Sequence, residues 1–363
     1  MNPSEFAFEL PDELIAQDAA PRGESRLLVL DRASGARRHL SIADLPSILH
    51  PGDLLVVNNT RVFAARLLGR RVPSGGAVEC LLLGPGNIAA DATGSESAVT
   101  ESASRLYEAL MHPGQKLKPG ARVRFEGAAG VLTAEVLARH FHGRRTIRLS
   151  ADSGSDVDAL VDALGHIPLP PYIKRPDRVD DRERYQTVFA RVRGSVAAPT
   201  AGLHFTGALL ESLDRAGIER AELTLHVGYG TFKPVRVDRV EDHVVDPEAY
   251  EISAASAAAI NRARLEGRRV IAVGTTTTRA LEDAARTGRG QVTAGHGTAR
   301  LFIYPGHQFR AIDGLLTNFH LPSSSLLMLV AAFAGTERIL DAYREAVAQR
   351  YRFYSYGDAM LIV

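Results

Sequence analysis

Two clusters rich in histidine, threonine and glycine stand close together near the middle of the chain. They read SVAAPTAGLHF and LTLHVGYGTF within residues 195–232, with one amphipathic segment between them. His204 and His226 belong to these clusters, and histidine is the side chain best suited to exchanging a proton near neutral pH. Three glycines there allow a ligand to approach the backbone closely: Gly202, Gly228 and Gly230. A strand-helix-strand crossover would bring both clusters to one sheet edge, so we predict that they line one pocket; ordinary tight turns are the alternative.

Other polar residues follow apolar runs that are typical of buried strands. In an open α/β sheet, positions at the carboxyl ends of strands hold ligands. The residues concerned are Asn59, Thr60, Arg61, Gly274, Thr275, Thr276, Asn318 and His320. Gly274 and the two threonines after it open a predicted helix, whose free amide groups bind an anion or a carboxylate. The first three residues are equally well explained as capping the strand before them.

The elements around these residues predict two domains, which is also the expectation for 363 residues. Strands and helices in residues 1–68 and 151–363 predict a layered α/β main domain. Short alternating runs separated by glycine in residues 69–150 predict a small antiparallel β-barrel inserted into it. Residues 86–104 are rich in Ser, Ala, Thr and Gly, so we expect a flexible loop whose deletion changes stability little.

Composition limits the classes of function. A hydrophobic content of 45% with 23% charged residues is typical of a folded protein. The net charge is only +1, so any nucleic-acid surface must be local. The single cysteine, Cys80, lies in the apolar run AVECLLL and is expected to be a buried thiol in a reducing cytoplasm. No apolar run reaches the ~18 residues of a membrane span, and the N-terminus lacks the pattern of a secretory signal, so we expect no membrane association.

Further patterns indicate an RNA-binding strip and argue against a metal. The proline-rich run PLPPYIKRP presents an aromatic ring and two cations that would stack on and neutralise RNA, or would form an interdomain strap: Tyr172, Lys174 and Arg175. The twelve histidines include no H-E-x-x-H, and His140 and His142 are best explained as barrel surface, so no metal is predicted. The chain has neither a Walker loop nor a G-x-G-x-x-G fingerprint, which removes the usual support for NTPases and dehydrogenases.

A colinear series of motifs covers nearly the whole chain. It includes GDLLVVNNTRV, PLPPYIKRP, SVAAPTAGLHFT, LTLHVGYGTFKPVRV, VIAVGTTTTRALE, LLTNFHLPSSSLLMLVAAFAG and YRFYSYGDAMLI. In these motifs the chain resembles the S-adenosylmethionine:tRNA ribosyltransferase-isomerase family of queuosine biosynthesis. The resemblance implies an α/β domain with an inserted β-barrel, no metal and no cofactor, with S-adenosylmethionine consumed as the ribosyl donor. The acceptor would be 7-aminomethyl-7-deazaguanine at the wobble position of tRNA, and the products would be epoxyqueuosine-tRNA, adenine and methionine.

The implied chemistry needs particular groups. The sulfonium acidifies the neighbouring C5′ hydrogens, so a base must take a proton and an acid must help adenine leave. The catalytic candidates are His204, His226 and His320. The substrate-binding candidates are Asn59, Thr60, Arg61, Thr200, Gly202, Gly228, Gly230, Gly274, Thr275, Thr276, Asn318, Tyr356 and Asp358. The candidates for facing the sulfonium as a carboxylate or an aromatic ring are Asp313, Asp358, Phe205 and Tyr356.

The chain departs from the family pattern at a few positions. Phe63 and Ala64 stand where an aliphatic residue and proline are usual, and Tyr229 replaces a small residue in HVGYGTF. Asp246 stands where a second histidine is frequent, so His243 is not expected to act through a histidine pair. Two other functions stay open at this point, a noncatalytic tRNA-binding protein and an S-adenosylmethionine-dependent methyltransferase. A monomer is our working hypothesis for the oligomeric state.

Overall fold

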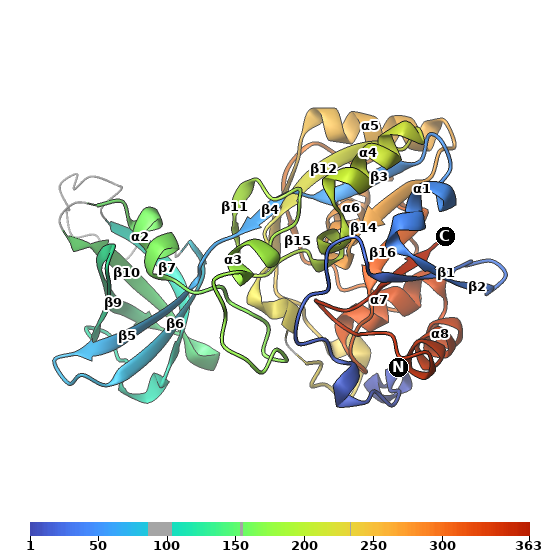
Figure 1. Ribbon diagram of the computed structural model, residues 1–363. Helices are drawn as coiled ribbons and strands as arrows, with labels where there is room; N and C mark the ends of the chain where they lie inside the picture. The colour runs from blue at the N-terminus through green and yellow to red at the C-terminus, as the bar shows by residue number, and fades with distance from the viewer. Residues whose placement is uncertain (86–103, 153–154, 233) are drawn as a thin grey trace.

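The computed structural model describes residues 1–85, 104–152, 155–232 and 234–363. Figure 1 shows a closed β-barrel beside a larger α/β domain. The fold class predicted from the sequence, an α/β main domain with a small antiparallel barrel, is therefore confirmed. The expected flexible loop at 86–104 lies outside the described residues except for its last position, so it stays a prediction.

A mixed sheet forms the middle layer of the α/β domain. Its described strands lie in the order β15-β13-β12-β3-β14-β16-β17-β1-β2. Their bounds are β1 (Arg26–Leu30), β2 (Arg37–Ser41), β3 (Leu54–Asn58), β12 (Glu219–Leu225), β13 (Glu248–Ile252), β14 (Val270–Val273), β15 (Gly295–Ala299), β16 (Gly314–Asn318) and β17 (Ala359–Ile362). The central strands β12, β3, β14 and β16 run parallel. Their carboxyl ends therefore meet at one edge, which is where open α/β sheets bind ligands.

Helices cover both faces of this sheet. They are α1 (Leu45–Ile48), α4 (Gly207–Arg215), α5 (Ala254–Leu265), α6 (Thr275–Thr287), α7 (Ser325–Ala334) and α8 (Thr336–Ala348). Successive side chains of a strand point to opposite faces, so Leu54 and Val56 of β3 belong to the core under α5 to α8. Leu55 and Val57 belong to the core under α1 and α4. The uninterrupted apolar run LLVV is the pattern of a strand buried on both faces.

The barrel is closed by strands in the order β10-β7-β6-β5-β8-β9. They are β5 (Arg66–Val72), β6 (Ala77–Pro85), β7 (Ser104–His112), β8 (Arg122–Gly127), β9 (Gly130–Arg139) and β10 (Arg144–Ala151). Alternate side chains such as Val123 and Phe125 fill its interior. The helix α2 (Val157–Leu164) packs on the same core. Cys80 is a buried free thiol there, as predicted, and burial raises its pKa to about 12.

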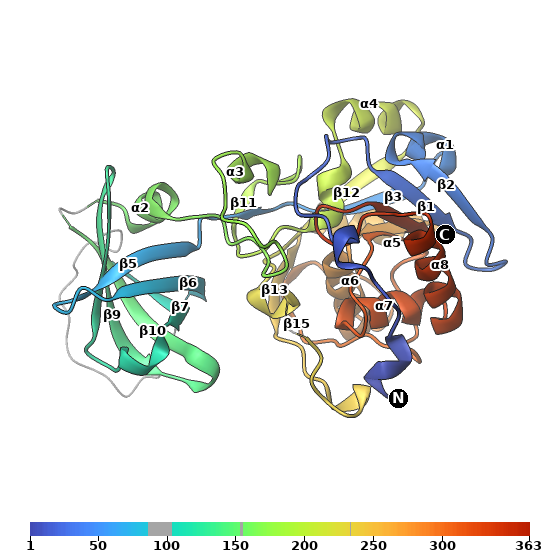
Figure 2. The same cartoon turned by 60° about the horizontal axis from the view of Figure 1, so that its bottom comes forward.

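The two parts are joined by β4 (Thr60–Val62) leading into β5, and by the chain that returns after α2 through α3 (Asp181–Arg184) (Figures 1 and 2). The strand β4 pairs in parallel with β11 (Val192–Ser195), which ties the outgoing chain to the returning one.

The short 3₁₀ helices of the described residues are η1 (Pro3–Phe6), η2 (Asp12–Leu14), η3 (Ile42–Asp44), η4 (Gly114–Lys116), η5 (Phe141–Gly143), η7 (Thr200–His204), η8 (Tyr229–Phe232) and η9 (Val240–Asp242). Among the described residues, no helix has the length and apolar character needed to cross a membrane.

Candidate active site

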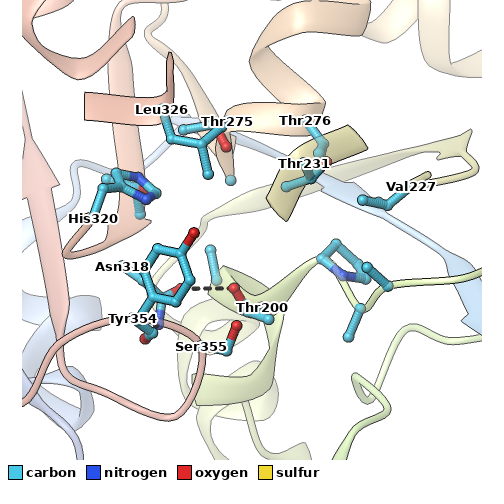
Figure 3. Close-up of a pocket in the computed structure, with 16 residues that line it drawn as sticks. Thr200, Val227, Thr231, Thr275, Thr276, Asn318, His320, Leu326, Tyr354 and Ser355 are labelled. Carbon is cyan, nitrogen blue, oxygen red and sulfur yellow. Dashed lines mark hydrogen bonds between the residues drawn. The ribbon is translucent and has the colours of Figure 1, made fainter. Parts of the chain in front are cut away.

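A pocket lies at the carboxyl edge of β14 and β16 (Figure 3). Its walls come from η7, the turn after β12, the first turn of α6, the turn after β16 and the turn before β17. The lining residues are Ala197, Ala198, Pro199, Thr200, Ala201, Val227, Thr231, Gly274, Thr275, Thr276, Thr317, Asn318, His320, Leu326, Tyr354 and Ser355. Six residues that the sequence singled out are thus brought together, although they come from three separate segments: Thr200, Gly274, Thr275, Thr276, Asn318 and His320.

The first turn of α6 points its polar groups at this pocket. Gly274 has φ +94°, a conformation that glycine adopts without strain, and it turns the chain from β14 directly into the helix. The hydroxyls of Thr277 and Thr278 donate back to the carbonyls of Val273 and Gly274, at 2.7 and 3.1 Å. The preceding threonines instead line the pocket beside the amide groups of the first turn, which have no acceptor within a helix. This arrangement suits a carboxylate or another anion.

Asn318 connects three segments at the bottom of the pocket. Its Nδ2 donates to the carbonyl oxygen of Tyr354 at 3.1 Å and lies 3.1 Å from Nε2 of His204. Its Oδ1 accepts from the hydroxyl of Thr200 at 3.4 Å, the bond drawn dashed in Figure 3. The amide orientation follows from these partners, because a carbonyl can only accept. Asn318 therefore fixes η7 and the turn before β17 against the end of β16.

His204 is a buried, neutral histidine in this network. Because the amide nitrogen of Asn318 can only donate, Nε2 of His204 is the acceptor and Nδ1 carries the proton toward the hydroxyl of Ser25, 2.8 Å away. Burial lowers the pKa of His204 to about 4, and the positive charge of Arg352 acts in the same direction. His204 does not line the pocket itself; it acts on it through Asn318, so its geometry is that of a positioning residue.

His320 lines the pocket directly (Figure 3). Its Nε2 is 2.9 Å from the hydroxyl of Thr317, and its backbone N–H donates to the hydroxyl of Tyr343 at 3.1 Å. Burial lowers the pKa of His320 to about 3, so the ring is uncharged at neutral pH. Among the predicted catalytic histidines, His320 is the one whose side chain meets this pocket.

His226 lies outside the pocket, although the next residue, Val227, lines it. Its Nδ1 is 2.8 Å from the hydroxyl of Thr60, and burial lowers its pKa. A Cβ at Gly194 would come within 2.6 Å of the ring, so only glycine fits there. Among the described hydrogen bonds, none joins His204 and His226, and their partners differ. Residues of both clusters line one pocket, as the sequence predicted, among them Thr200 and Thr231. The side chains of His204 and His226 do not meet in it, so the prediction that these two histidines share one pocket was wrong.

Asn59 and Arg61 also lie away from the pocket. The side chain of Asn59 accepts from Thr224 at 2.7 Å and donates to Glu222 at 3.2 Å, and Asn59 borders an open groove beside α5. Arg61 is exposed on β4. The capping alternative considered for this segment describes Asn59 better than ligand binding does.

The aromatic ring at the pocket belongs to Tyr354 and not to Tyr356. Tyr354 has φ +75°, which is strained for a side chain of this size and is a feature of functional turns. Its ring packs edge-on against Tyr172 with 3.9 Å between ring centroids. The hydroxyl of Tyr356 instead donates to Asp181 at 3.2 Å.

The other candidates for facing the sulfonium are held by backbone hydrogen bonds or by packing in the core. Asp358 accepts from the backbone N–H groups of Arg26 and Arg352, at 3.1 and 2.8 Å. Asp313 accepts from the backbone of Val270 at 2.9 Å, and Phe205 is fully buried in the core under α4. None of these side chains lines the pocket.

A buried ion pair that the sequence did not reveal holds the turn after β12. Glu248 accepts from the backbone N–H of Gly228 at 3.0 Å and from the hydroxyl of Thr231 at 3.3 Å. Its other oxygen accepts from Arg279 of α6 at 2.5 Å. Burial raises the pKa of Glu248, and the guanidinium of Arg279 opposes this rise. The pair therefore places Thr231 at the pocket.

Close packing explains two of the three glycines of the clusters, Gly202 and Gly230. A Cβ at Gly230 would come within 2.6 Å of the carboxylate of Asp246, and one at Gly202 within 2.8 Å of Thr187. Gly228 binds Glu248 through its backbone. None of the three lines the pocket, so they shape its surroundings.

The proline-rich strip lines a cleft of ≈ 410 Å³ between the barrel and the α/β domain, together with Tyr229. The side chain of Lys174 is 75% exposed, with Asp12 3.6 Å away. Arg175 instead donates two hydrogen bonds of 2.7 and 3.0 Å to the carboxylate of Asp181, and these raise the pKa of Arg175. Tyr172 shares a hydrogen bond with Ser355 next to the pocket. Lys174 is thus the available cation of the strip, and Arg175 stabilises the fold.

Metal coordination finds no support in the part of the chain that the structure describes. There, no cluster of three or more His, Cys, Asp or Glu side chains is placed to hold a metal ion.

These observations define an α/β protein with an inserted six-stranded barrel and a polar pocket at the carboxyl edge of its sheet. Residues 3–362 match the model of the queuosine biosynthesis protein family, and the chain belongs to that family. This confirms the resemblance drawn from the motifs.

Relatives of the same length support this assignment. The S-adenosylmethionine:tRNA ribosyltransferase-isomerase of Heliobacterium modesticaldum is 50% identical over 359 residues, covering 99% of this chain and 98% of the relative. That of an Anaeromyxobacter species is 51% identical over 363 residues, covering 100% and 99%. The crystal structure of S-adenosylmethionine tRNA ribosyltransferase from Thermotoga maritima is 36% identical, covers 99% of this chain and 100% of that chain, and gives a TM-score of 0.54.

Proposed function

We propose that this chain is an S-adenosylmethionine:tRNA ribosyltransferase-isomerase. It transfers and isomerises the ribosyl group of S-adenosylmethionine onto 7-aminomethyl-7-deazaguanine at the wobble position of tRNA, and it releases adenine and methionine. The observation that carries the proposal is the full-length relationship to proteins of this name. We further propose that S-adenosylmethionine is a consumed substrate with no separate cofactor, and that the reaction takes place in the cytoplasm, where tRNA is found.

The pocket at the carboxyl edge offers partners for the carboxylate, the sulfonium and the C5′ hydrogens of S-adenosylmethionine. The first turn of α6 would receive the carboxylate of the methionine moiety. The ring of Tyr354 would face the sulfonium, since a cation is attracted to an aromatic face. His320 would lie near C5′ as the proton acceptor. Because burial keeps its ring uncharged at neutral pH, His320 has a nitrogen lone pair that can accept this proton.

The pocket must widen to take this substrate. It encloses only ≈ 40 Å³, enough for a few water molecules, whereas pockets for ligands of this size measure roughly 300–1,000 Å³. The turn held by Glu248 and the strained turn at Tyr354 are the two walls that would move. The first turn lines the larger cleft under the proline-rich strip through Tyr229, and the second packs against Tyr172 of the strip. The base of the tRNA would reach the pocket through this cleft.

One incubation tests the proposal. The protein is mixed with S-adenosylmethionine and tRNA that carries the 7-aminomethyl-7-deazaguanine base, and small molecules and nucleosides are analysed by mass spectrometry. Adenine, methionine and epoxyqueuosine in equal amounts are expected. S-adenosylhomocysteine would indicate a methyltransferase, and tRNA binding without any product would indicate a noncatalytic binding protein; either result overturns the proposal.

A further inference from the structure

Positive charge is concentrated in the barrel. Residues 66–151 contain 12 Lys and Arg against 7 Asp and Glu, so this part of the sequence carries +5 while the whole chain carries +1. Three of those seven acids fall in residues 86–103, outside the described structure. A local excess of this kind in a nearly neutral chain is the electrostatic pattern of a surface that meets a polyanion.

A buried arginine without a carboxylate lies at one end of the barrel. Arg145 is 1% exposed, and its guanidinium donates to the carbonyl oxygens of Leu117, Arg144 and Gly114 at 3.0, 2.9 and 2.8 Å. Its hydrogen bonds are therefore satisfied, but its charge is not neutralised by any carboxylate within 4.0 Å in the described residues. Burial and then the charge of Arg139 lower its pKa. A fixed positive charge of this kind raises the potential of the surface above it.

Three exposed cations surround this arginine. Lys116 and Lys118 flank Leu117, whose carbonyl Arg145 binds, and Arg139 of β9 lies directly opposite Arg145 of β10. Like charges at directly opposed positions repel each other, so this pairing costs stability. No carboxylate of the described chain lies within 4.0 Å of the three exposed cations. Most other barrel arginines do have such partners, for example Arg66 with Glu79 at 2.7 Å.

This end of the barrel adjoins the rim of the pocket. Arg144, the neighbour of Arg145, forms an ion pair of 3.0 Å with Asp246 of the α/β domain. Asp246 packs against Gly230, which directly precedes the pocket residue Thr231. A nucleic acid with one base in the pocket would therefore carry its neighbouring phosphates past this end of the barrel.

We propose that Lys116, Lys118 and Arg139 form a docking surface for the phosphate backbone of the RNA substrate. This inference rests on the proposed function, because it takes tRNA as the molecule that reaches the pocket. The surface lies apart from the proline-rich strip and reads no sequence, since contacts to phosphates position a nucleic acid without specifying its bases. It supplies the local positive charge that a chain with a net charge of only +1 needs in order to bind a polyanion such as tRNA.

The test compares two triple variants with the same change in charge. The first is Lys116→Gln, Lys118→Gln and Arg139→Gln. The control removes three exposed arginines of the α/β domain: Arg38→Gln, Arg262→Gln and Arg344→Gln. Binding of unmodified tRNA is measured between 50 and 200 mM salt, together with S-adenosylmethionine binding and product formation.

We expect the slope of log K against log salt to become less steep by about 2 to 3 in the barrel variant, at ~0.7–0.9 per lost contact, and to stay close to wild type in the control. S-adenosylmethionine binding should be unchanged in both. Equal slopes in the barrel variant and wild type, or equal losses in both triple variants, would overturn the inference. Failure of the wild-type protein to form epoxyqueuosine would instead count against the proposed function, so the two failures are distinguishable.

Discussion

Replacing Glu248 by leucine should destabilise the protein strongly. The side chains of Glu248 and Arg279 are 3% and 10% exposed, so the change leaves a buried guanidinium without its carboxylate. Breaking a buried pair by removing one partner costs roughly 3–5 kcal/mol. Arg279 still donates to the carbonyl oxygens of Ala299 and Leu301, at 3.1 and 3.2 Å, which favours the lower end of this range of free energies. The lost hydrogen bond from the Gly228 N–H adds about 1 kcal/mol. We therefore expect a loss of about 4 kcal/mol.

The assay is urea unfolding, followed by circular dichroism, of four variants: Glu248→Leu, Glu248→Gln, Arg279→Met and the double variant Glu248→Leu with Arg279→Met. Glu248→Gln should lose less than Glu248→Leu, because the amide oxygen still accepts from Gly228. The double variant Glu248→Leu with Arg279→Met should also lose less than the single leucine variant, since no buried charge is left unpaired. A single leucine variant within about 1 kcal/mol of wild type, or a double variant whose loss equals the sum of both single losses, would refute this reasoning.

Three further predictions concern individual residues. Because the pKa of His204 is lowered from 6.5 to about 4, the unfolded chain takes up this proton before the folded one as the pH falls. The free energy of unfolding should therefore drop by about 3 kcal/mol between pH 6.5 and 4, and it should drop less in His204→Gln. Urea unfolding at several pH values measures both. His320→Gln should still fold and bind S-adenosylmethionine but turn over ~100- to 10,000-fold more slowly and no longer exchange the C5′ hydrogen with deuterium; near-normal turnover would remove His320 as the base. Lys174→Ala should weaken tRNA binding and leave the melting temperature unchanged. Arg175→Ala should instead lower the melting temperature, because the buried carboxylate of Asp181, 5% exposed, loses the guanidinium that neutralises its charge. The opposite pattern would contradict these roles.

The fold and part of the site could be predicted because they depend on local patterns. The apolar run of β3, the glycine-threonine turn into α6 and the turn with Asn318 and His320 are each readable in a few residues, and parallel strands bring their carboxyl ends together. Short alternating strands likewise indicated the barrel.

The remaining features depend on contacts between distant residues. Glu248 and Arg279 are 31 positions apart, and no local pattern shows that both are buried. Tyr356 and Tyr354 are indistinguishable in the run YRFYSYGDAM; only the backbone angle of Tyr354 and the bond from Asn318 place its ring at the pocket. Sequence proximity also suggested that His204 and His226 share a site, but each is held by a residue far along the chain, Asn318 for the first and Thr60 for the second.

The central claim is that S-adenosylmethionine binds at the carboxyl edge of β14 and β16. A crystal structure of the complex with S-adenosylmethionine tests it most directly. We predict that the carboxylate lies at the first turn of α6 and the sulfonium at the ring of Tyr354. His320 should lie within hydrogen-bonding distance of the ribose, and the volume of the pocket should exceed ≈ 40 Å³. A ligand bound instead in the open groove beside Asn59 and α5, with this pocket unchanged, would contradict the account.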